Sequence, residues 1–444
     1  MTTLFDTQST SPAGTAAPAE PASRLRLWAK RGAAAFVDQL LTSGSNFALS
    51  IILARALPAA EYGAYAVAFA IFLLIANLYQ GALLTPSLLL GTTRFADRKG
   101  EYAGAMIRLH YWLGAGCLAV LGLAALAFAT LSDKQDLARC LAAMAVATPA
   151  VLLLWLVRSA WYLRLEPGPA AWGAGLYALV LVGGAMALRQ LGWLTAVSGI
   201  LMMGSAGLVA GMWLLYRLKP VWSGRLSVSE VWREGWQFGR WEMAIAFAAW
   251  LPASLCYPVA ANVLGDSQAG ALRALQNFAL PVTQAMTSVL RLLQPYVSGK
   301  FGRDGESPER AVWLLTGLAL AGTAFYLAVV SVLRRPLLAI AYSGKFSEAV
   351  DLLPWIILPA VLATGTESLA MGLRAMRGSK RLILAYLAAS VVYLATGVPV
   401  ARAFGLTGVA ATLVLANLAG LVTAAVLFRR QTSKANIAMG SATR

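Results

Sequence analysis

Segment 270–297 is long and apolar enough to cross a bilayer, yet it carries two arginines and several amides and hydroxyls. Wound as a helix at about 100° per residue, it places its polar side chains within roughly 60° of one direction. They are Arg273, Gln276, Asn277, Gln284, Thr287, Ser288, Arg291 and Gln294. Arginine donors suit a phosphate group, and amides suit sugar hydroxyls. Because lipid offers no water to replace lost hydrogen bonds, this face is expected to line protein or a water-filled cavity.

The two arginines of this segment also have a simpler interpretation. Arg273 and Arg291 point the same way and lie about 27 Å apart along a helix that rises about 1.5 Å per residue. Each could therefore extend to its own membrane interface. Pro281 is expected to kink the helix.

A second polar stripe runs along segment 33–57, where Gln39, Thr42, Ser43, Asn46 and Ser50 share one face. Helix packing through small polar residues is the better explanation for Ser43 and Ser50. For Gln39 and Asn46 we favour a substrate cavity. Arg158, with its neighbours Trp155 and Tyr162, is a further candidate for contact with sugar.

Glu367 is expected to be the deepest carboxylate in the membrane, whereas Asp38 is expected near the cytoplasmic end of its span and Arg374 in a cytoplasmic basic tract. Glu367 is a candidate for ion coupling, with a static salt bridge as the alternative. Arg374 is seven residues away, about 10 Å along the helix, which predicts no direct pair without a water or a neighbour. Asp38 is expected to pair with Lys30, Arg31 or a neighbouring loop.

Composition places the chain among membrane proteins. Its 444 residues are 59% hydrophobic and 12% charged, with a mean hydropathy of +0.68, whereas soluble chains carry about 25% charge. The net charge of +17 would favour nucleic acid only on a soluble domain, and none is visible, so no nucleic-acid partner is expected. The three cysteines lie in apolar segments without metal-like spacing, and no cofactor is predicted.

The hydropathy pattern predicts an all-α polytopic membrane protein with about 12 transmembrane helices. Their approximate limits are 33–57, 62–90, 105–131, 137–157, 169–188, 193–216, 241–264, 270–297, 311–333, 353–373, 382–401 and 405–428. About three quarters of the 36 lysines and arginines fall on one side of this arrangement, which predicts cytoplasmic termini. The expected division is a disordered tail (1–30), an N-lobe (31–216), a cytoplasmic linker (217–240), a C-lobe (241–428) and a C-terminal tail (429–444).

The chain also repeats itself over six spans. With an offset of 207, Ala54 matches Ala261, Leu57 matches Leu264 and Gly63 matches Gly270. With an offset of 213, Arg164 matches Arg377 and Gly192 matches Gly405. Six is even, so the halves share one orientation, which predicts two six-helix lobes about a pseudo-twofold axis along the membrane normal.

Segment 36–72 resembles the opening of bacterial polysaccharide flippases, the Wzx-type branch of the multidrug/oligosaccharidyl-lipid/polysaccharide exporter superfamily. The likeness is carried by the polar first helix, by Ala54–Arg55 and by Glu61–Tyr62–Gly63 before an aromatic-rich helix. The resemblance implies a V-shaped pair of lobes around a cationic cavity. An undecaprenyl-diphosphate-linked oligosaccharide would cross there to the outer leaflet of the bacterial inner membrane, with polysaccharide polymerase or export proteins as possible partners.

Other classes fit less well. A polysaccharide polymerase or ligase would need a large outer loop with acid and base residues, and no catalytic motif is found, so an enzyme is not expected. A cation-coupled multidrug antiporter of the same superfamily would usually want an acidic cavity. A peptidoglycan lipid-precursor flippase remains an alternative that is closer in substrate, although that family generally carries two more C-terminal spans.

Overall fold

The computed structural model describes residues 21–222, 226–286, 289–290, 293, 309–376 and 379–442. Every regular element in these ranges is a helix, as the hydropathy pattern predicts. The first half contains α1 (Pro21–Ala56), α2 (Ala59–Tyr79), the π-helix η1 (Gln80–Leu84), α3 (Thr85–Thr92), the 3₁₀-helix η2 (Ala96–Arg98), α4 (Lys99–Leu131), α5 (Gln135–Leu163), α6 (Pro167–Gln190) and α7 (Ala196–Leu218). The second half contains α8 (Val228–Ser254), α9 (Cys256–Val263), α10 (Asp266–Gln276), the 3₁₀-helix η3 (Asn277–Ala279), α12 (Glu309–Val332), α13 (Arg334–Tyr342), the 3₁₀-helix η4 (Ser347–Leu352), α14 (Leu353–Ala375) and α15 (Ser379–Ala442).

Ten helical stretches of the described ranges are long and apolar enough to cross a membrane. One of them, Arg381–Ser433, covers two expected spans, because α15 turns back on itself at Gly405, where φ is +61°. The expected span 270–297 is described only in part, as α10, η3 and the helical residues 280–286. The chain is therefore a multi-pass membrane protein with about the expected number of spans.

Several helices are longer than the hydropathy pattern predicts. The first helix starts at Pro21, inside the segment expected to be disordered, and α15 continues to Ala442, inside the expected C-terminal tail. Most of the expected linker is the first part of α8, which Ser227 caps by accepting a hydrogen bond from the Ser229 amide (3.2 Å). Hydropathy detects only the apolar part of a helix, so polar turns at its ends are missed.

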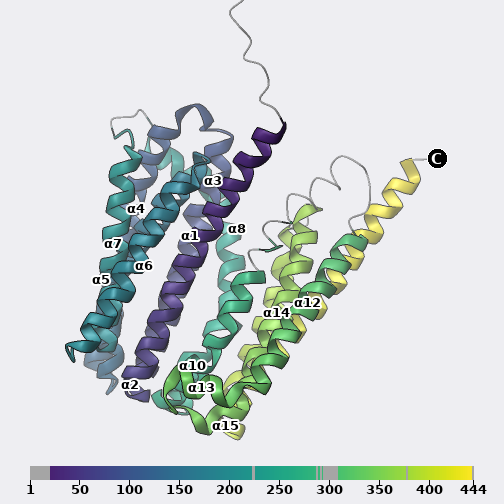
Figure 1. Ribbon diagram of the computed structural model, residues 1–444. Coiled ribbons are helices and arrows are strands. Elements are labelled where there is room, and N and C mark those ends of the chain that lie inside the picture. The colour runs from purple at the N-terminus through teal and green to yellow at the C-terminus, as the bar shows by residue number, and fades with distance from the viewer. Residues whose placement is uncertain are drawn as a thin grey trace, which may run out of the picture.

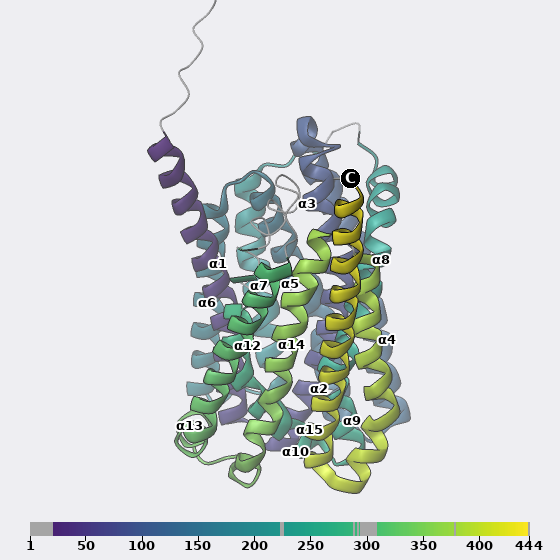
Figure 2. The same cartoon turned by 90° about the vertical axis from the view of Figure 1, so that its right-hand side faces the viewer.

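The helices form two groups that converge at one end (Figure 1). Helices α1–α7 pack together, as do α12, α14 and α15, while α8 contacts both groups. The start of α1 and the end of α15 lie at the same end of the molecule, which we call the tail end (Figure 2). At the opposite end, α2 packs against α10 (Figure 1), and we call this the crossing end.

The glycines of both internal matches occupy equivalent positions of the structure, whereas Arg377, the partner of Arg164 in the second match, lies outside the described residues. At the crossing end, Gly63 lies against Asp266, and Gly270 lies against Ala59. Residues 59 and 63 become 266 and 270 when 207 is added, so the two contacts are twofold copies of each other. In the second match, Gly192 (φ +72°) and Gly405 (φ +61°) both make left-handed turns, which glycine adopts without steric cost. The predicted pseudo-twofold relation is confirmed.

Candidate functional site

A buried polar cluster joins the two halves of the molecule near the crossing of α2 and α10. We call it the junction cluster, and its members are Ser50, Tyr62, Asn277 and Tyr342. At its centre, Asn277 Oδ1 accepts a hydrogen bond from Ser50 Oγ of α1 (3.1 Å). The Asn277 Nδ2 atom donates to Tyr62 Oη of α2 (3.1 Å) and to Tyr342 Oη of α13 (3.2 Å). An unpaired buried amide is costly, so these bonds stabilise the contact between the halves. Asn277 is thus a junction residue in this conformation.

Arg273 lies one turn before Asn277 on α10 and is only 7% exposed. Its guanidinium carbon is 4.7 Å from the ring centre of Phe69 on α2 and 5.5 Å from that of Tyr257 on α9. Its Nη1 donates to Tyr257 Oη (3.2 Å), whereas its Nε is buried without a partner. Within the described ranges, no carboxylate forms an ion pair with Arg273. A buried cation held by aromatic faces, with donor capacity left over, is suited to an anionic ligand.

The rest of the polar face of segment 270–297 is described only in part. Gln276 accepts a hydrogen bond from Tyr257 Oη, and Gln284 is half-buried in the helical stretch 280–286. The second arginine of the face, Arg291, lies outside the described residues. The helix changes to 3₁₀ geometry at η3, directly before Pro281. This is the irregularity that Pro281 predicts, since its ring crowds the carbonyl of Asn277.

The polar stripe of α1 does not gather at one place. Ser50 reaches Asn277, but Asn46 Oδ1 accepts from Tyr177 Oη of α6 (2.8 Å), within the first half. Gln39 Nε2 donates to Ser43 Oγ one turn away (2.9 Å), about 17 Å from Ser50 along a helix that rises about 1.5 Å per residue. Gln39 therefore lies toward the tail end, away from the junction cluster.

A carboxylate, an arginine and a tyrosine form a closed group inside the first half. Arg158 donates to Asp38 through Nε (3.0 Å) and Nη2 (2.6 Å), and Tyr162 Oη donates to the same carboxylate (2.6 Å). The predicted partners of Asp38, at the start of α1 or in a loop, are wrong, because α5 brings Arg158 against α1. Arg158 is thus engaged with Asp38, and a ligand would have to compete for it.

A second group of one carboxylate, one arginine and one tyrosine lies in the second half. Glu367 Oε2 is 3.6 Å from Arg374 Nη1, and Glu367 also accepts a hydrogen bond from Tyr386 Oη of α15. The prediction of no direct pair is wrong, because both side chains extend along the helix and span the two turns between them. The Glu367 side chain is 44% exposed, so it is accessible in this conformation.

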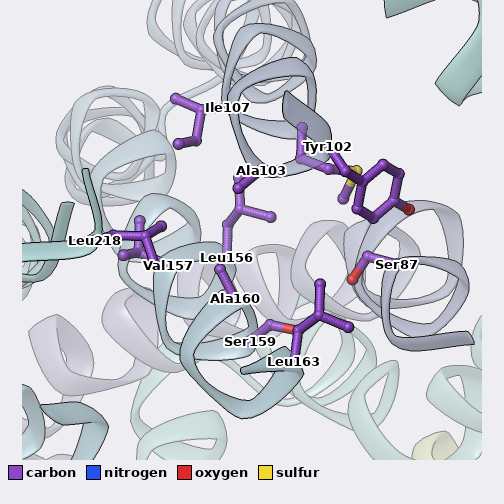
Figure 3. Close-up of a pocket in the computed structure, with 11 residues that line it drawn as sticks. Ser87, Tyr102, Ala103, Ile107, Leu156, Val157, Ser159, Ala160, Leu163 and Leu218 are labelled. Carbon is purple, nitrogen blue, oxygen red and sulfur yellow. The ribbon is translucent and has the colours of Figure 1, made fainter. Parts of the chain in front are cut away.

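A small cavity in the first half is separate from the junction cluster. It measures about 20 Å³, is lined mainly by apolar side chains of α4 and α5, and has Ser159 on its wall (Figure 3). The buried Ser159 Oγ has no hydrogen-bond partner. The volume suits a single water molecule and excludes a larger ligand.

No sequence pattern predicted the aromatic residues that surround Arg273 and Asn277. Phe69, Tyr257 and Tyr342 are common residue types in a membrane helix and give no signal. The Glu61–Tyr62–Gly63 motif did carry one. Tyr62 binds Asn277, Gly63 lies at the crossing, and Glu61 Oε1 accepts a hydrogen bond from the Ala196 amide at the start of α7 (2.7 Å).

The sequence matches no protein-family model and no curated protein. Solved structures do match. An inward-facing multidrug resistance MATE family transporter of the MOP superfamily is similar over 90% of this chain and 99% of its own, with a TM-score of 0.76 at 13% identity. The inward closed conformation of the lipid II flippase MurJ is similar over 92% and 90%, with a TM-score of 0.69 at 12% identity.

An outward-facing multidrug resistance MATE family transporter gives a TM-score of only 0.64, at 14% identity over 93% of this chain and 96% of its own. These likenesses concern the fold, since all three identities are below 15%. This chain has the fold of the MOP-superfamily transporters and flippases.

Proposed function

We propose that the protein is a secondary transporter that flips an undecaprenyl-diphosphate-linked oligosaccharide from the cytoplasmic to the outer leaflet. The observation that carries this proposal is Arg273, a guanidinium buried between the halves without a carboxylate partner in the described ranges. A diphosphate supplies the anion that this site lacks. If the two ends of the bundle open in turn, the diphosphate can cross the membrane while the lipid tails stay in the bilayer.

Each candidate residue has a role in this proposal. Arg273, followed by Arg291, binds the diphosphate, while Asn277 and Gln284 hydrogen-bond the sugars from the same segment. Gln39 and Asn46 contact the glycan from the first half, and Arg158 does so only where the glycan displaces Asp38. In the conformation described, Asn277 is occupied by Ser50, Tyr62 and Tyr342. Substrate binding would therefore compete with the contacts that hold the halves together.

The proposed setting is the bacterial plasma membrane, with both termini in the cytoplasm. The division into lobes at 31–216 and 241–428 follows the pseudo-twofold relation, with 217–240 connecting them. Membrane lipids surround the protein, and polysaccharide polymerase or export proteins act beside it. Glu367 takes part in coupling transport to an ion gradient, because its carboxylate is half-exposed and loosely paired.

A multidrug antiporter is the second candidate. It is favoured by the likeness to the inward-facing MATE transporter, and a half-exposed Glu367 would suit a cationic drug. Deletion of the gene separates the two candidates when surface polysaccharide and the intracellular lipid-linked repeat unit are measured together. A flippase predicts loss of polymer with accumulation of the intermediate. Normal polymer together with new sensitivity to cationic compounds would reject the flippase and favour the antiporter.

Substitution of Arg273 tests the phosphate-binding role directly. Arg273→Ala should reduce polymer export about tenfold or more, since a hydrogen bond to a charged group contributes about 1.5–3 kcal/mol. Arg273→Lys keeps the charge and should recover part of the export. Arg139→Ala is the matched control, because Arg139 is 70% exposed and pairs only weakly with Asp136. Export at the parent level from Arg273→Ala, at equal protein level, would exclude Arg273 as the diphosphate ligand.

A further inference from the structure

The backbones of α2 and α10 approach more closely at the crossing end than any side chain would allow. A Cβ atom built on Gly63 would lie 1.8 Å from the carbonyl oxygen of Asp266, and one on Gly270 would lie 2.4 Å from that of Ala59. Ordinary carbon–oxygen contacts are no shorter than about 3.3 Å. Both clashes are with backbone, so no rotation of a side chain relieves them.

This contact is the point where the pseudo-twofold axis passes between the halves. Gly63 and Gly270 are repeat partners, as are Ala59 and Asp266. The same contact is therefore made twice, once in each direction, as in the isologous interface of a symmetric dimer. A substitution on either helix should have an equivalent effect, which a one-sided helix contact would not require.

Polar contacts around the crossing join the halves at the same end. Lys134, between α4 and α5, donates to the Asp266 carboxylate (2.9 Å) and to the carbonyl of Ala261 (3.1 Å). From the second half, Lys345 donates to the carbonyls of Arg55 and Leu57, each at 2.9 Å, at the C-terminal end of α1. A cation is favourable at a helix C-terminus because it offsets the helix dipole. The Lys134–Asp266 pair is about two-thirds buried, so solvent screens it less than a fully exposed surface pair.

We propose that Gly63 and Gly270 form the gate that closes the crossing end, with the Lys134–Asp266 pair as its latch. The glycines permit the closed state, in which the two backbones touch. They are not needed once the helices separate, because the clash then disappears. A larger residue at either position thus destabilises the closed crossing and favours the conformation that is open at this end. The proposal rests on the proposed transport cycle only in requiring that the crossing opens during turnover.

The test measures the separation of the two helices in the purified full-length protein without substrate. Spin labels are placed on Ala60→Cys and Ser267→Cys, both exposed positions next to the crossing, after replacement of Cys117, Cys140 and Cys256. Double electron–electron resonance should give a main distance that shifts to longer values in Gly63→Val and in Gly270→Val. Gly122→Val is the matched control, because nothing lies within 4 Å of a Cβ at that position.

An unchanged distance distribution in both monodisperse glycine variants would overturn the gate. If neither variant is monodisperse, Asp266→Asn replaces them, since it removes the latch and keeps the shape of the side chain. A shift of the population toward longer distances is then expected, and a distribution identical to that of the parent overturns the proposal. The distance measurement involves no substrate, so the gate and the diphosphate site are tested separately. A longer distance between the labels, found together with normal export from Arg273→Ala, would support the gate and reject the diphosphate site.

Discussion

Two groups of one carboxylate, one arginine and one tyrosine occupy the two halves of the molecule in very different surroundings. In the first half, Asp38 is 1% exposed and Arg158 is 12% exposed, and hydrogen bonds of 3.0 and 2.6 Å join them. In the second half, Glu367 is 44% exposed and its nearest contact with Arg374 is 3.6 Å. Similar groups can therefore have different roles, because burial decides how much stability is lost when one partner is removed.

The buried group has the properties of a structural support. Removal of one partner leaves a charge in a place that water cannot reach, which is strongly destabilising. The exposed group has the properties of a site that changes its protonation or its partner during function. The Glu367–Arg374 contact is long, at 3.6 Å, and the carboxylate is accessible in this conformation.

The largest effect is expected from Asp38→Asn. This change removes the charge that Arg158 neutralises, and loss of a buried pair costs about 3–5 kcal/mol. Thermal unfolding of the purified protein in detergent should show a clear decrease in Tm. Asp136→Asn is the matched control, since the Asp136–Arg139 pair is exposed and 3.7 Å apart. Equal Tm values for the two variants would mean that the buried group is no support.

Removing the tyrosine hydroxyl should also lower the Tm more in the buried group than in the exposed group, but by less than Asp38→Asn does. Tyr162→Phe removes a hydrogen bond to a buried carboxylate, which is expected to cost about 1.5–3 kcal/mol. Tyr386→Phe makes the same chemical change beside Glu367, whose side chain is 44% exposed whereas that of Asp38 is 1% exposed. The decrease in Tm should therefore be larger for Tyr162→Phe. A larger decrease for Tyr386→Phe would reverse the comparison.

The smallest effect on stability is expected from Glu367→Gln, about 1 kcal/mol or less, because the pair is half-exposed. Its effect should instead appear in transport. In proteoliposomes, the dependence of flipping on an imposed proton gradient should be lost, since glutamine cannot exchange a proton. Glu348→Gln, in η4 at an exposed position, serves as the control. Gradient-dependent flipping at the parent level in Glu367→Gln would make Glu367 a static partner of Arg374.

Much of the fold could be predicted from local patterns. The apolar segments predicted the membrane helices, and glycine matches at offsets of 207 and 213 predicted the twofold relation that the crossing and the left-handed turns display. The polar face of α10 also led to Arg273 and Asn277. Its extension to Arg291 stays a prediction, because that residue lies outside the described ranges.

The partners of these residues could not be predicted in the same way. Asp38 meets Arg158 across 120 positions of the chain, and Ser50 meets Asn277 across 227. Helical periodicity describes which residues share a face and says nothing of which distant face lies opposite. For Glu367 and Arg374 the error was local, since the rise per residue measures the separation of backbones and ignores the reach of two long side chains.

The sequence alone determined that the chain crosses the membrane many times, that its halves repeat, and that α10 carries polar groups into the apolar region. These properties follow from hydrophobicity and helical period, which depend on neighbouring residues. Only the tertiary structure decided that Asp38 forms a buried ion pair with Arg158, that Glu367 stays accessible, and that Arg273 has aromatic neighbours. Burial and pairing are properties of the packed molecule, because they depend on which helices come together from distant parts of the chain.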